Sequence, residues 1–126
     1  MNFMVKVFKK KESEEISKKG YSANYVADVQ FMKHLDTGGF ILVRIDPGEK
    51  SAPHAHEELE EIFVALSDMI MYVDSIEYRL ETGDVVLVEP KEAHSFEGLS
   101  DTPARILAIK FPNLKTDKIE VNQESS

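Results

Sequence analysis

The chain has 126 residues, a length typical of one domain with a single hydrophobic core. It contains no cysteine, which excludes thiolate metal ligands, a cysteine nucleophile and a disulfide-stabilised secreted scaffold. Its net charge of −8 repels phosphate groups, so we expect no binding to nucleic acids or to anionic membranes. The N-terminus lacks an apolar run of signal-peptide length, and no stretch reaches the ~20 apolar residues of a membrane helix. We therefore expect a cytoplasmic protein.

The first predicted element is a short helix near the N-terminus. Ser13 is placed to cap it, Glu14 and Glu15 would lie in its first turn, and the stretch from Lys18 to Gly20 is typical of a helix end. We interpret residues 1–39 as an extension of helix and strand that precedes the main domain.

From residue 40 onward, short apolar runs alternate with turn residues. Strands of about five residues at this spacing predict an all-β sandwich or closed barrel, not βαβ units. We expect this barrel to occupy residues 40–114, followed by a polar and frayed tail over residues 115–126. The apolar runs are Phe40–Ile45, Ile62–Leu66, Met69–Val73, Ile76–Leu80, Val85–Val88 and Ile106–Phe111.

The polarity of these runs bears on assembly. Ile76–Leu80 alternates between apolar and polar residues, as expected for a strand with one face in water. Val85–Val88 is apolar on both faces. A partner subunit commonly covers an apolar outer face of a small barrel, so the pattern predicts a homodimer.

A first cluster of candidate metal ligands begins at His54 and His56. These histidines are two residues apart, so on a strand both imidazoles point to the same face. Glu60 and Glu61 follow as candidate carboxylate ligands. We favour Glu61, because it directly precedes the Ile62–Leu66 run and is in phase with its alternate positions. The alternative interpretation is an exposed loop with two incidental histidines.

A second cluster lies further along the chain. A run that starts after Gly83 leads to a turn at Pro90 and then to His94. Taken alone, His94 is also compatible with a hydrogen-bonded core histidine.

Together the two clusters resemble the paired motifs of the cupin superfamily. The first motif has a glycine, five residues, His-x-His, three or four residues and a glutamate; the second has a glycine, five residues, a proline-containing turn and a histidine. The resemblance covers about residues 40–111. The matching residues are Gly48, His54, His56 and Glu61 in the first motif and Gly83, Pro90 and His94 in the second. Where family members usually have glycine, this chain has Asp68, Ser75 and Lys91, and where they favour asparagine it has Gly98.

The resemblance implies a double-stranded β-helix, the jelly-roll barrel of cupins, with one divalent transition metal per chain. The implied ligands are His54, His56, Glu61 and His94. Three imidazoles and a carboxylate suit iron, manganese, nickel, cobalt, copper or zinc without distinguishing among them. A six-coordinate ion would keep two positions for water or substrate, whereas tetrahedral zinc would be closed and structural.

The resemblance further implies an enzyme of the dioxygenase, isomerase or lyase type that acts on a small polar molecule. No acid–base pair outside the metal ligands stands out, so we assign no catalytic residue. We expect Phe63 and Phe96 to line the substrate pocket, because each lies two residues from a ligand. Arg44, Tyr72 and Lys110 are candidate polar contacts to an anionic substrate, and an outward-facing role in salt bridges is the alternative for each. The alternatives are a barrel that binds a ligand without catalysis and a structural zinc barrel.

Overall fold

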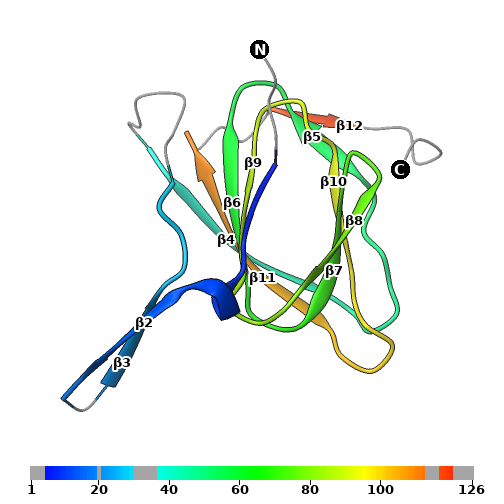
Figure 1. The fold of residues 1–126 in the computed structure, drawn as a ribbon. Coiled ribbons are helices and arrows are strands. Elements are labelled where there is room, and N and C mark those ends of the chain that lie inside the picture. The colour runs from blue at the N-terminus through cyan, green and yellow to red at the C-terminus, as the bar shows by residue number, and fades with distance from the viewer. Residues whose placement is uncertain (1–4, 20, 30–36, 113–116, 121–126) are drawn as a thin grey trace.

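The computed structural model describes residues 5–19, 21–29, 37–112 and 117–120, and it is built almost entirely of β-strands (Figure 1). Two five-stranded antiparallel sheets face each other, and a separate two-stranded hairpin precedes them. The first sheet has the order β1 (Lys6–Phe8), β9 (Val85–Val88), β6 (Glu60–Ala65), β11 (Ala104–Phe111) and β4 (Gly39–Ile45). The second has the order β12 (Lys118–Glu120), β5 (His54–His56), β10 (His94–Glu97), β7 (Met69–Val73) and β8 (Ile76–Leu80). The predicted all-β barrel is thus confirmed.

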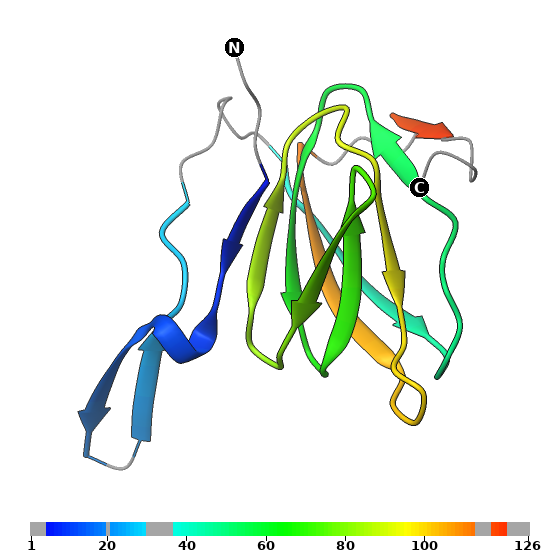
Figure 2. The same ribbon diagram turned by 45° about the vertical axis from the view of Figure 1, so that its right-hand side comes forward.

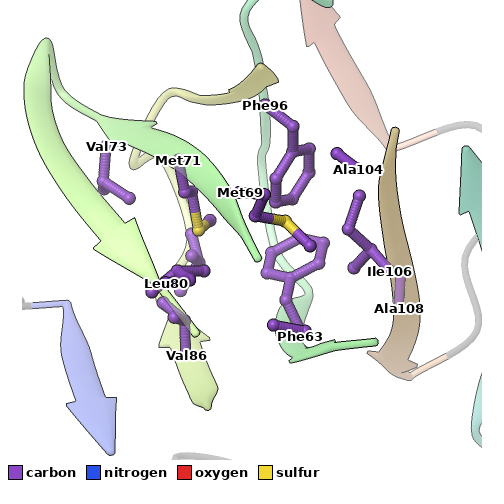
Figure 3. Packing of buried hydrophobic residues seen from close by; sticks show 12 residues of the cluster. Phe63, Met69, Met71, Val73, Leu80, Val86, Phe96, Ala104, Ile106 and Ala108 are labelled. Atoms are coloured by element: carbon purple, nitrogen blue, oxygen red, sulfur yellow. The ribbon is translucent and has the colours of Figure 1, made fainter. Parts of the chain in front are cut away.

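The core lies between the two sheets, and the pleat of the strands explains its composition. Along β11, Ala104, Ile106 and Ala108 are buried while the residues between them face outward. Phe63 on β6 and Phe96 on β10 meet edge to face, with ring centroids 5.0 Å apart, and Met69 lies beside them (Figure 3). Burial of a side chain of this size stabilises the fold by about 1.5–3 kcal/mol.

The N-terminal segment does not form the predicted helix. Only Lys10–Glu12 makes a 3₁₀ turn, and Glu14–Lys18 is a strand, β2, paired with β3 (Tyr21–Tyr25). Ser13 does not cap the start of a helix; it follows the 3₁₀ turn, where its amide and its hydroxyl both donate to the Lys10 carbonyl. A helix this short is unstable without an apolar face to pack, and Ile16 is the single apolar residue between Ser13 and Lys19. Pairing in a hairpin satisfies the backbone instead.

The hairpin of β2 and β3 projects away from the barrel (Figures 1 and 2). Its base is fixed to the barrel at the fully buried Asp84, which follows β8. The Asp84 carboxylate accepts hydrogen bonds from the Lys10 and Glu81 amides at 2.9 and 2.7 Å, and it forms an ion pair with Lys9. These bonds and the neighbouring Lys9 ammonium lower the pKa of Asp84 although burial acts to raise it.

Several turns depart from the residues that cupins usually carry. Ser75 and Lys91 adopt left-handed backbone angles, with φ of 68° and 71°, which is where glycine is usually favoured. Asp68 has no such angle; its carboxylate instead accepts a 2.9 Å bond from the Thr82 amide. Gly98 has a steric reason to be glycine, because a Cβ there would lie 2.5 Å from the Asp46 carbonyl oxygen. The fold therefore accommodates each departure.

Part of the C-terminal segment that we expected to fray is ordered as β12, which pairs with β5. No helix among the described residues has both the length and the apolar character needed to span a membrane.

Candidate metal centre

The four predicted metal ligands meet between the two sheets. His54 and His56 lie at the two ends of β5, and His94 opens the neighbouring strand β10, where it is paired with His54. Glu61 comes from β6 in the opposite sheet. Since His54 and His56 are two apart on a strand, both imidazoles reach the same side, as the spacing predicted. One ligand atom from each of the four residues lies within 4.8 Å of all the others.

The shortest contacts in this group centre on the carboxylate of Glu61. Its Oε1 atom lies 2.6 Å from His56 Nε2 and 3.3 Å from His94 Nε2. Burial acts to raise the pKa of Glu61, but contacts with the two imidazoles outweigh it and lower the pKa to about 2. The carboxylate is therefore ionised at neutral pH and available as a ligand.

The same atoms lack the hydrogen-bond geometry expected for buried polar groups. His56, Glu61 and His94 are 4%, 3% and 1% exposed, yet His56 Nε2, Glu61 Oε1 and His94 Nε2 make no well-formed hydrogen bond. Leaving such atoms unsatisfied costs about 1–3 kcal/mol each. A bound cation would accept all three lone pairs at once, so the donor set fits a divalent metal ion.

A backbone group orients the imidazole of His94. His94 Nδ1 lies 3.2 Å from the Glu92 carbonyl oxygen, and donation of the Nδ1 proton to that oxygen leaves Nε2 free to face Glu61. The Lys91 amide donates to the His56 carbonyl at 2.7 Å, which ties the turn before β10 to the end of β5. A hydrogen bond to a ring nitrogen, as in His94, fixes the tautomer and ring orientation of a ligating histidine.

Asp117 is a positioning residue that the sequence did not reveal. Its carboxylate accepts hydrogen bonds from the amides of Glu58 and Leu59 at 2.8 and 3.0 Å, and its carbonyl accepts a third from Glu57 at 3.1 Å. These amides belong to the loop that joins His56 to Glu61. Asp117 thus holds the loop that sets the spacing between two ligands.

Of the two glutamates left open, the structure brings Glu61 to the histidines and turns Glu60 away. Glu60 is buried beside Glu89, on the other side of the strand. Burial and the neighbouring Glu60 and Glu92 carboxylates raise the pKa of Glu89 to about 7. Two carboxyl groups this close resist ionising together.

A cavity of about 170 Å³ adjoins the ligands. Phe63 and Phe96 line it, as expected from their spacing. The other apolar side chains come from β4 and β11, and His54, His56 and Glu61 belong to the polar part of the lining. The remaining lining residues are Ile41, Val43, Ile45, Ala108, Ser51 and Lys110.

Arg44 and Tyr72, also expected at the pocket, do not line it. Val43 and Ile45 face the cavity, so Arg44 between them points outward, where it pairs with the Asp46 carboxylate. Tyr72 is on the outer side of β7. Its hydroxyl donates a 2.7 Å bond to Glu97, which raises the pKa of Tyr72 to about 12, and Lys50 Nζ lies 4.1 Å from the centre of its ring.

Comparison with known proteins shows which family the sequence resembles. The sequence model of the cupin domain matches residues 41–110. An uncharacterised protein of Methanocaldococcus jannaschii is 28% identical over 75 residues, which are 59% of this chain and 60% of that protein. The match thus spans about 60% of the length of this curated relative.

Two solved structures share the fold. The dTDP sugar isomerase of Desulfovibrio desulfuricans superposes with a TM-score of 0.67 at 14% identity, covering 96% of this chain and 85% of that one. The DMSP lyase of Ruegeria pomeroyi superposes with a TM-score of 0.62 at 22% identity, covering 72% and 46%.

Proposed function

This chain belongs to the cupin family, and on that premise we propose that it is a metal-dependent enzyme acting on a small molecule. The observation that supports this most is the convergence of three buried, unsatisfied ligand atoms at the wall of a cavity. A purely structural site needs no adjoining space, whereas a catalytic one must admit a substrate.

In this proposal His54, His56, Glu61 and His94 hold one divalent ion per chain. When bound, such an ion supplies a Lewis acid for an oxygen atom of the substrate. The ionised Glu61 carboxylate offsets part of its charge. Phe63 and Phe96 exclude water from one side of the site and offer an apolar surface to the substrate.

Dioxygenase, isomerase and lyase reactions are all compatible with this ligand set. The matched isomerase and lyase illustrate that one fold supports different reactions. No acid or base outside the four ligands is assigned a catalytic role in this proposal.

A structural zinc barrel is the second candidate, favoured by the number of protein ligands. Three imidazoles and one carboxylate are enough to close a tetrahedral zinc site. In that case the ion would stabilise the fold, and the cavity beside it would serve at most for binding.

Metal analysis and cobalt substitution test both candidates. We expect about one metal per chain in the native protein and a large loss in His56→Ala. Four-coordinate Co(II) absorbs far more strongly than six-coordinate Co(II), and azide should shift the bands of an open site. Full metal occupancy in His56→Ala would overturn the ligand assignment. A four-coordinate Co(II) spectrum that is indifferent to azide would replace the enzyme with the structural barrel.

A further inference from the structure

Lys110 is placed to interact with a charged group of a molecule bound in the cavity. It lies on β11, directly opposite the metal ligand Glu61 on β6 and opposite Gly39 on β4. Cross-strand partners point to the same face of a sheet, so Lys110 faces inward with Glu61. It is half-buried and lines the cavity. Gly39 contributes no side chain beside it.

The ammonium of Lys110 has no acidic partner among the residues that the structure describes. No carboxylate in those ranges lies within 4.0 Å of its Nζ, although Glu61 is its neighbour across the strands. The Glu61 carboxylate is instead engaged by His56 and His94. Lys110 is also the one cationic side chain in the described lining of the cavity, apart from the histidines.

The remainder of the cavity is suited to the apolar portion of a small ligand. Ile41, Val43 and Ile45 from β4 line it together with Phe63 and Phe96. The Ser51 hydroxyl, which accepts a 2.9 Å bond from the Phe96 amide, retains its own proton for donation. At about 170 Å³ the cavity is smaller than the ~300–1,000 Å³ typical of sites for drug-sized ligands.

From this placement we propose that the substrate is a small carboxylic acid with an apolar side chain, and that Lys110 binds its carboxylate. The apolar portion lies against Phe63 and Phe96, within reach of the metal ligands. Lys110 acts as a specificity residue that selects an anion over a neutral analogue. This inference rests on the proposed function, because it names the substrate class for the same cavity.

Binding measurements with paired probes test the inference. Butyrate and butyramide have the same shape, and the acid alone carries a charge. We expect Co(II)-loaded protein to bind butyrate at least 10-fold more tightly than butyramide in calorimetry, since a charged hydrogen bond in a partly desolvated site contributes strongly. Lys110→Met should lose that preference and Lys110→Arg should restore most of it. Lys11→Met removes an equal charge from an exposed site and should change nothing.

The outcomes separate this inference from the proposed function. If azide shifts the Co(II) bands but butyrate and butyramide bind equally, or if Lys110→Met keeps the preference, the role of Lys110 is refuted and the enzyme proposal stands. If the preference depends on Lys110 while the Co(II) spectrum ignores azide and butyrate alike, the anion site stands and the enzyme proposal falls.

Discussion

At the residue scale, the buried carboxyl group of Glu89 makes the free energy of unfolding depend on pH. Glu89 is 7% exposed and lies near Glu60 and Glu92, with Lys6 as the cation that acts to lower its pKa. Because its pKa is raised to about 7 in the folded protein, Glu89 keeps its proton while the unfolded chain loses it above about pH 4.5. The stabilisation that protonated Glu89 contributes is complete below pH 4.5 and is lost as the pH rises to about 7.

Glu89→Gln should remove the loss of stability between pH 4.5 and about pH 7. A glutamine amide imitates the protonated acid and can donate to Glu60. We expect the variant to match the wild type in free energy of unfolding near pH 4.5 and to exceed it by on the order of 1–2 kcal/mol at pH 8. Urea unfolding at several pH values measures the difference, with the exposed Glu49→Gln as the control. A constant difference across that range would contradict the assignment.

At this scale the sequence predicted the grouping of the candidate ligands better than their surroundings. His54, His56 and Glu61 followed from a period of two beside a polar-to-apolar boundary, which fixes a face. The runs that contain Arg44 and Tyr72 are apolar on both sides, so alternation there does not reveal which face is inward. Lys110 faces inward because Ala108 two residues earlier does, yet only the register with Glu61 shows what it faces.

At the scale of elements, the loop between β5 and β6 depends on a strand far along the chain. Asp117 precedes β12, and its carboxylate accepts hydrogen bonds from the amides of Glu58 and Leu59 in this loop. Spacing in the sequence carries no sign of this contact, because Asp117 lies 59 and 58 residues from Glu58 and Leu59 and the segments meet only in the folded structure. The incorrect helix near the N-terminus has a different cause: local signals favoured a helix, and pairing of Glu14–Lys18 with the nearby β3 prevailed.

Asp117→Ala should lower both the stability of the fold and the affinity of the site for metal. Its loss leaves the Glu58 and Leu59 amides without their acceptor, and Leu59 is almost fully buried. We expect unfolding to become easier by about 1–3 kcal/mol and metal affinity to fall about 10- to 100-fold. Thermal unfolding and competition with a chelator measure the two effects, and Asp101→Ala, at an exposed site, is the control. Unchanged metal affinity would mean that the loop holds its ligands without Asp117.

At the scale of the whole molecule, the homodimer stays a prediction, but the surface that suggested it is not available for an interface. Val85–Val88, which suggested it, is buried within the single chain, with Leu87 fully inaccessible. Of the exposed large apolar residues in the described ranges, Phe40, Ile41 and Leu42 lie together on β4, an edge strand among the described strands of its sheet, where Phe40 is 71% and Leu42 78% exposed. An unpaired edge that carries such side chains suits a second copy of the same strand.

Leu42→Lys should therefore separate the subunits. We expect the wild type to elute with about twice the chain mass of 14.3 kDa and the variant with the mass of one chain. Ile76→Lys, at an exposed position on β8 in the other sheet, should leave the mass unchanged. Light scattering after size-exclusion chromatography gives these masses. A wild-type protein that is monomeric at micromolar concentration would rule the dimer out.

The distribution of the candidate ligands over both sheets would give a bound ion a mechanical role. Three of them belong to one sheet and Glu61 to the other, so coordination would join the two layers across the core. A chain without cysteine has no disulfide to link its layers, and a coordinated ion would act as a reversible cross-link. Metal at 1,000 times its dissociation constant would hold the layers together by about 4 kcal/mol, and a chelator would release them.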